Sequence, residues 1–170
     1  MHVNGAIKAN FSYKPGTYWI YKDSLSGTLD STYIKENIVQ NVDGGTELIE
    51  HINMEIFYYD YLDSSTLSGL YTLYQNHIGT YLGNVDYPFV PGNIEGGGTL
   101  LDIYNDYHTN GQTYKDVAVV SHLIQSGAHL LIDTFYINTS AGIIKSITYE
   151  KTDTMKINRV WKLQRYNIIK

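Results

Sequence analysis

The chain has 170 residues, no cysteine and a formal net charge of −5. This length fits one domain, and the lack of cysteine excludes disulfides, thiolate metal sites and a cysteine nucleophile. Acidic and basic residues are scattered singly, which argues against a nucleic-acid surface, and no run of about 18 apolar residues exists that would span a membrane. Tyrosine is abundant, at 17 residues against 4 phenylalanines, and it suits the half-buried surface of a β-sheet.

The first residues are mostly polar and small, so we expect residues 1–12 to form a flexible lead-in to a single β domain over residues 13–170. The start of the chain lacks the charged segment and apolar run of a signal peptide. Tyr13–Gly16 then predicts a turn, because Pro15 fixes its own φ and Gly16 follows it.

Three strands are predicted in the next part of the chain. Thr17–Lys22 favours a strand at nearly every position, and Ser24–Thr28 is a turn that leads into a returning strand over Ser31–Gln40. Farther on, apolar and polar residues alternate, which indicates a strand with one buried and one solvated face. Its apolar face carries Leu48, Ile52, Met54, Ile56 and Tyr58.

Residues 65–82 fit two interpretations. Their apolar residues have helical spacing, at Leu67, Leu70, Tyr71, Tyr74 and Ile78. Gly69, Gly79 and the aromatic content disfavour a helix, so we predict a hairpin, with a short helix as the alternative. Residues 83–98 hold two prolines and a run of three glycines, and we predict a long irregular loop there.

The second half of the chain begins with a hairpin. Strands are predicted over Leu100–His108 and Gln112–Ile124, joined at Asn110-Gly111, a pair that accepts the positive φ values of a type I′ turn. Val117–Val120 is apolar at both parities, which indicates a strand that is buried on both faces.

Two further strands form the hairpin Leu130–Glu150, in which Gly142 supplies the left-handed φ that closes the turn. The closing run, Asn158–Ile168, also alternates like a strand. One of its faces is expected to carry Val160, Lys162, Gln164, Tyr166 and Ile168. The other face is expected to carry Trp161, Leu163 and Arg165.

About nine to eleven strands joined by tight turns indicate an up-and-down antiparallel sheet. A sheet of this size tends to curl. We therefore predict an all-β fold, in which a single antiparallel and strongly curved sheet, mostly hairpin-connected, forms a barrel or half-barrel.

Three short segments contain recognisable motifs. Tyr13–Tyr21 has a G-x-x-W-x-Y pattern, Asn110–Val117 has the form N-G-x-x-Y-x-x-V, and Thr134–Lys145 ends in glycine, two hydrophobic residues and lysine. Together they resemble uncharacterised exported lipoproteins of Bacteroidetes-type bacteria. The resemblance implies an exported domain, periplasmic or anchored to the outer membrane by an N-terminal lipid on a cysteine that this sequence does not contain.

Gly16-Thr17-Tyr18-Trp19 is also similar to the G-x-W opening of lipocalin-like barrels, with one residue more. In that family an arginine near the C-terminus stacks on the tryptophan, which implies a contact between Arg165 and Trp19. The extra residue, however, places Trp19 on the opposite face of its strand.

No catalytic, metal or cofactor signature is found. The six histidines lack the spacing of paired metal ligands. Asp102, Asp106 and His108 share one parity of a predicted strand, yet no nucleophile or oxyanion hole accompanies them, and a solvated strand face explains them better. We therefore do not expect an enzyme.

The surplus of tyrosine is the main functional signal, because aromatic clusters line apolar pockets and sugar-stacking surfaces. We predict a non-enzymatic cell-envelope domain that binds an apolar or glycan ligand on a Tyr-rich surface. The candidate wall consists of Trp19, Tyr58, Tyr71, Tyr74 and Tyr87. One alternative is that these rings fill the core of the sheet. Another is a structural or protein-partner-binding envelope lipoprotein domain without a small-molecule site, for which an exposed apolar patch would be the sign.

Overall fold

The computed structural model describes residues 2–3, 5–43, 48–60, 65–74, 77–80, 83–86, 92–94, 98–126, 129–151 and 155–170. These ranges contain one short helix and a series of antiparallel strands. In chain order they are α1 (Gly5–Phe11), β1 (Tyr18–Asp23), β2 (Leu29–Asp43), β3 (Leu48–Asp60), β4 (Ser65–Tyr74), β5 (His77–Thr80), β6 (Gly83–Asp86), β7 (Gly92–Ile94), β8 (Gly98–Thr109), β9 (Gln112–Ser126), β10 (His129–Asn138), β11 (Gly142–Lys151) and β12 (Met155–Asn167).

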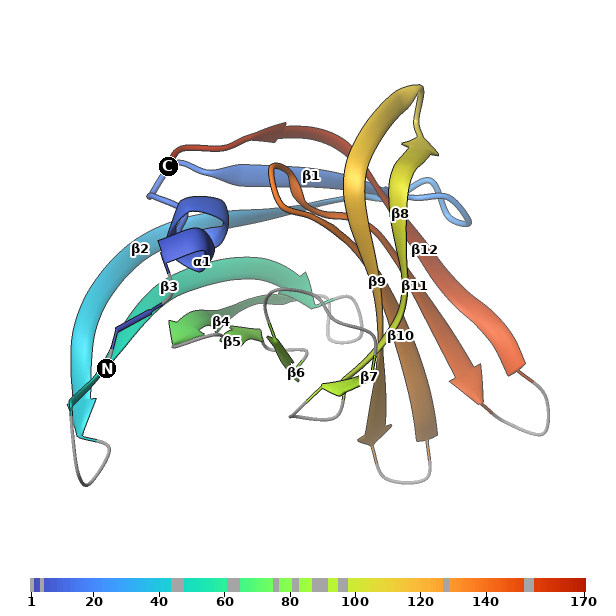
Figure 1. Cartoon of the computed structure of the whole chain (residues 1–170). Coiled ribbons are helices and arrows are strands. Elements are labelled where there is room, and N and C mark those ends of the chain that lie inside the picture. The colour runs from blue at the N-terminus through green and yellow to red at the C-terminus, as the bar shows by residue number, and fades with distance from the viewer. Residues whose placement is uncertain are drawn as a thin grey trace.

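The twelve described strands form one sheet in the order β6-β5-β4-β3-β2-β1-β12-β11-β10-β9-β8-β7. Consecutive strands pair with each other, except that β6 and β7 form the two edges and the first strand, β1, pairs with the last, β12. Two meanders therefore meet along the β1–β12 pair. The sheet curls into a half-barrel (Figure 1), which confirms the predicted fold class.

Turn chemistry places most of the hairpins where the sequence predicts them. Asn110 and Gly111 have φ values of 49° and 73°, as a type I′ turn requires. Gly142 closes the β10–β11 turn with a φ of 78°. The described residues of the segment 65–82 form the predicted hairpin strands and not a helix, since β4 and β5 pair antiparallel.

The N-terminal segment differs from the flexible lead-in predicted for residues 1–12. Residues 5–11 form α1, which lies inside the curl of the sheet (Figure 1) and contacts β4 and β5. The side chains of Ile7 and Phe11 are completely buried, and Val3 is nearly so. A few apolar side chains at helical spacing are enough to dock such a segment, because the half-barrel offers an apolar inner face to cover them.

The core cluster extends from α1 and this inner face of the sheet to Val117, which shares its side of β9 with Val119, and the partly buried Tyr107 and Tyr136 pack against the cluster. Besides the helix residues it contains buried side chains from both meanders, namely Tyr13, Trp19, Ile34, Ile52, Met54, Leu73, Tyr114, Val117, Ala141, Ile144 and Leu163. Val117–Val120 is buried at every position, as its apolar run predicts. One hydrophobic cluster therefore joins the two halves of the sheet.

The long irregular loop predicted over residues 83–98 is not irregular throughout. β6 pairs with β5, and β7 pairs with β8; residues 87–91 and 95–97 lie outside the described ranges. The Gly- and Asn-rich composition of these segments does not predict strands. Such short strands form because a neighbouring strand offers an edge to pair with, and not because of their own β propensity.

The predicted division of the last strand into two faces is wrong at its C-terminal end. Ile20 pairs with Arg165 and Tyr21 with Leu163, so Gln164 is an extra residue in β12. A bulge of this kind reverses the parity of the residues that follow it. Lys162 and Tyr166 therefore lie on opposite faces.

Candidate functional site

The predicted ligand wall is distributed over several parts of the molecule. Tyr58 lies in β3, and Tyr71 and Tyr74 lie in β4, where the register pairs them with Met54 and His51. Tyr87 lies outside the described residues. For Tyr58, Tyr71 and Tyr74 the structure describes the strand position and not the side chain.

Trp19 belongs to the core. Its indole Nε1 donates a hydrogen bond to the carbonyl oxygen of Ala141 at 2.7 Å, and its ring meets the edge of Tyr13 with ring centres 5.0 Å apart. The arginine contact implied by the lipocalin resemblance falls on its neighbour, since Arg165 lies over the ring of Tyr18 at 5.8 Å. These contacts give Trp19 a structural role.

Asp102, Asp106 and His108 do not converge. All three are exposed on β8, and six residues of strand separate Asp102 from His108 by roughly 20 Å. His108 Nδ1 is 2.8 Å from the hydroxyl of Thr113. Within the described ranges no group of three His, Cys, Asp or Glu side chains is placed to hold a metal ion.

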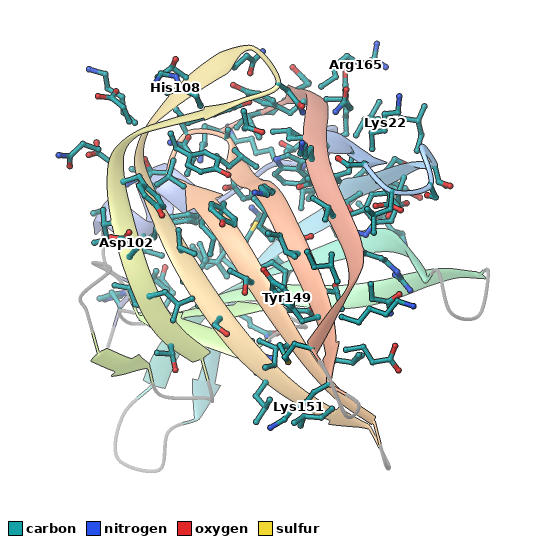
Figure 2. All side chains as sticks on the ribbon, turned by 90° about the vertical axis from the view of Figure 1, so that its right-hand side faces the viewer. Lys22, Asp102, His108, Tyr149, Lys151 and Arg165 are labelled. Carbon is teal, nitrogen blue, oxygen red and sulfur yellow. The ribbon has the colours of Figure 1, made fainter. Side chains whose placement is uncertain are left out.

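A different surface brings aromatic and charged side chains together. It is the outer face, the side of β8–β12 and β1 that is opposite α1 and that faces the viewer in Figure 2. Directly paired residues form one row across six strands of this face. In order they are Asp102, Val119, Tyr136, Lys145, Lys162 and Lys22. Directly opposite residues of an antiparallel sheet point to the same side.

Three tyrosines gather at the β8 end of this row. The ring centres of Tyr104 and Tyr107 are 5.6 Å apart, and those of Tyr107 and Tyr136 are 4.9 Å apart. The Lys145 ammonium lies 4.6 Å from the ring centre of Tyr136 and 3.1 Å from the hydroxyl of Tyr107. A cation this close to an aromatic face is held by the ring quadrupole.

The β8–β9 hairpin curls over this face. Tyr107 of β8 contacts Tyr136 of β10 and Lys145 of β11, although β9 lies between β8 and β10 in the sheet. At the tip of the hairpin, Asn110 Nδ2 donates to the carbonyl oxygen of Leu163 in β12 at 2.7 Å. Figure 2 shows the hairpin arching over the upper end of the strands.

The tyrosine hydroxyls of this cluster stay protonated. Burial raises the pKa values of Tyr107 and Tyr136, and for Tyr136 this outweighs the opposing effect of Lys145. The carboxylate of Asp102 raises the pKa of Tyr104. All three hydroxyls therefore stay protonated at neutral pH, and each already has a hydrogen-bond partner, since Tyr104 bonds to Asp102 and Tyr107 bonds to Tyr136 and Lys145.

Apolar side chains continue the outer face below the row. They belong to strands β10–β12 and are partly buried, at Ile132, Ile147, Tyr149 and Val160. Tyr149 lies near the middle of the face in Figure 2. A sheet face open to solvent is normally polar. Part of this apolar, aromatic face is covered by the β8–β9 hairpin, and the partly buried side chains below the row remain accessible.

A separate polar cleft of about 580 Å³ lies at the turn ends of the hairpins. It is lined by Gln112–Asp116, Asn138–Ser140 and Tyr166. Much of its polar wall is used within the protein: the Asn138 side-chain oxygen accepts hydrogen bonds from Ser140 and Ala141, and its Nδ2 donates to the Lys115 carbonyl oxygen. This cleft therefore mainly supports the β10–β11 turn.

Tyr104, Tyr107, Tyr136 and Lys145 are not among the residues predicted from the sequence to form a site. One signal was present: β10 and β11 carry apolar residues at both parities, in LLIDTFYIN and GIIKSITYEK. That pattern indicates two covered faces, and the curl of β8–β9 that gathers the tyrosines is visible only in the structure.

No helix in the described part of the chain has the length and apolar character needed to cross a bilayer. Comparisons with family models, with curated proteins and with solved structures found no match to this chain.

Proposed function

We propose that this chain is a non-enzymatic binding module that holds a ligand on the Tyr-rich outer face of β8–β12. The observation that carries the proposal is the cluster of Tyr104, Tyr107 and Tyr136, whose rings touch on a sheet face. Aromatic rings bearing protonated hydroxyls suit a ligand with apolar faces and polar edges, such as a sugar ring or an amphiphile.

The experiment is an NMR-monitored titration of the whole chain with neutral oligosaccharides and, separately, with a non-ionic alkyl glycoside below its micelle concentration. We expect shift changes that concentrate in β8, β10 and β11. Tyr104 is 40% exposed, and Tyr104→Ala should weaken binding roughly tenfold, since an aromatic contact contributes up to about 1.5 kcal/mol.

The matched control is Tyr33→Ala, because Tyr33 is similarly exposed, at 44%, but lies on β2. It should leave the affinity unchanged. Equal losses in both variants, or shift changes confined to the polar cleft, would contradict the proposed site.

A second function, docking of a protein partner, is favoured by one observation. Leu123, Met155 and Ile157 are each about half exposed. Protein interfaces use such apolar surface. If Leu123→Ser and Ile157→Ser improve solubility and leave ligand titrations unchanged, the two roles belong to different parts of the face.

Export to the cell envelope, with or without a lipid tether, also belongs to the proposal. It is supported by the three sequence segments that resemble exported lipoproteins. Fractionation of the native host with an antibody against the chain tests it, and recovery of the chain in the cytosolic fraction would contradict it.

A further inference from the structure

Three lysines lie in line on the outer face. Lys145 of β11 is directly opposite Lys162 of β12, which is directly opposite Lys22 of β1. Adjacent strands are about 4.8 Å apart, so the row carries positive charge at regular intervals. Like charges directly opposite each other destabilise a sheet. An anionic ligand bound along the row would relieve this repulsion.

Other cations add to the same face. Lys151 and Arg165 also lie on it (Figure 2), and at its β8 edge Lys115 is directly opposite an acid, Asp106. Because the chain as a whole has a net charge of −5, this concentration is a local feature and not the result of a basic composition.

The described carboxylates leave the row without a counter-ion. Lys8 forms an ion pair with Glu50 at the opposite side of the molecule, while in the described part of the chain no ion pair involves Lys22, Lys145 or Lys162. Lys145 is held by the hydroxyl of Tyr107 and the ring of Tyr136. The single acid of the row, Asp102, is at its far end, beyond Val119 and Tyr136.

We propose that the ligand of this face is an acidic glycan, an inference that rests on the proposed function. Its carboxylate or sulfate groups lie along Lys145, Lys162 and Lys22, and a sugar ring packs against Tyr104. A line of cations fits a linear polyanion better than a single anion. The acidic chain and Asp102 at the end of the row disfavour a nucleic acid, whose backbone needs an extended basic surface.

The test compares oligosaccharides of one length that are neutral, carboxylated or sulfated, by calorimetry at several salt concentrations. We expect the acidic ligands to bind at least tenfold more tightly than the neutral one, with an affinity that falls as salt rises. The carboxylated and sulfated arms identify which acid is preferred.

Two double variants locate the effect. Lys22→Gln with Lys162→Gln should weaken the acidic ligand about tenfold, which is what two partly exposed ion pairs contribute together, and should leave the neutral ligand unaffected. The control is Lys14→Gln with Lys156→Gln: both lysines are exposed, and Lys156 lies on β12 opposite Glu150, on the other face.

The outcomes separate this inference from the proposed function. Equal affinity for neutral and acidic ligands overturns the inference and leaves the binding function standing. Binding of none of the oligosaccharides overturns the inference, and the proposed function falls with it if the alkyl glycoside does not bind either. Equal or tighter binding of an oligothymidylate, or equal losses in the two double variants, shows a general polyanion effect and also overturns the inference.

Discussion

At the scale of single residues, Gly142 meets two requirements at once. Its φ is 78°, and a Cβ added there would come within 3.1 Å of Trp19 Nε1. Trp19 is fixed in that place by its hydrogen bond to Ala141. The turn residue and the core tryptophan therefore constrain each other. The sequence indicates the need for a positive φ at Gly142, but it does not indicate that Trp19 leaves no room for a Cβ.

Comparison of two alanine variants separates backbone strain from steric conflict. Gly27 has a φ of 77° and nothing within 4 Å of an added Cβ, so Gly27→Ala should cost about 1–2 kcal/mol, from the left-handed conformation alone. Gly142→Ala should cost clearly more. Urea unfolding measures both free energies, and equal losses would show that Trp19 moves away without cost.

The buried carboxyl group of Asp133 should make the stability of the fold depend on pH. Asp133 is only 9% exposed and lies directly between His122 of β9 and Thr148 of β11. In the described part of the chain, Asp133 Oδ1 and His122 Nδ1 are buried without a hydrogen-bond partner. Burial raises the pKa of Asp133, and the opposing effects of Thr148, His122 and Arg159 are smaller.

Stability should therefore depend on pH through this carboxyl group. Because the pKa is raised in the folded state, the folded chain binds the proton more tightly than the unfolded chain. The favourable contribution of Asp133 is complete at pH values below its unfolded pKa of about 4, and it is lost as pH rises through the folded pKa. Relative to Asp133→Asn, the wild-type free energy of unfolding should fall over that window and then level off. A rise with pH would contradict this.

At the scale of elements, α1 is held in the half-barrel by both apolar and polar contacts. Ile7 and Phe11 fill the core. The Glu50 carboxylate accepts hydrogen bonds from Lys8 Nζ at 2.7 Å and from the Val3 amide at 2.9 Å. The bond from Lys8, followed by that from Val3, lowers the pKa of Glu50, so this anchor weakens only in acid. The short helix has no independent stability and depends on these contacts.

Removal of one side chain tests this dependence. Phe11→Ala should lower the free energy of unfolding by about 3–5 kcal/mol, because it leaves a cavity in the core. Leu29→Ala serves as the control, since Leu29 is 64% exposed and its loss should change stability by at most about 0.5 kcal/mol. A flexible N-terminal segment would instead give the same small effect in both variants.

At the scale of the whole molecule, the pairing of β1 with β12 unites two meanders that are far apart in the chain. The core cluster also crosses this junction, because Ile52 and Leu73 belong to it together with Val117 and Ile144. The first and last strands thus lie in the middle of the sheet, and its edges are the short strands β6 and β7.

The chain should therefore unfold in one step. Far-ultraviolet circular dichroism, which reports on all strands, and the fluorescence of Trp19 and Trp161, which reports on β1 and β12, should give coincident urea transitions. Amide exchange should be slowest in β1 and β12. A separate early transition that leaves tryptophan fluorescence unchanged would show that the two meanders unfold independently.

The sequence by itself determines the local structure of this protein. Turns at Asn110-Gly111 and Gly142 need a positive φ that few residues adopt, and period-two alternation specifies strands. Strand content, the hairpins and the curved all-β class follow from such short-range rules. They do not specify short edge strands such as β6 and β7, or the extra residue at Gln164, because these depend on which strand lies alongside.

The tertiary structure alone decided what lies together on each face. The row from Asp102 to Lys22 requires the register of six strands and the pairing of the two chain ends, and the tyrosine cluster requires the curl of one hairpin over the sheet. These are contacts between residues distant in sequence, which local propensity does not encode. The sequence therefore predicted the scaffold correctly, whereas it gave no indication of this row or of the tyrosine cluster, and the predicted wall of Trp19, Tyr58, Tyr71, Tyr74 and Tyr87 stays a prediction except at Trp19, which lies in the core.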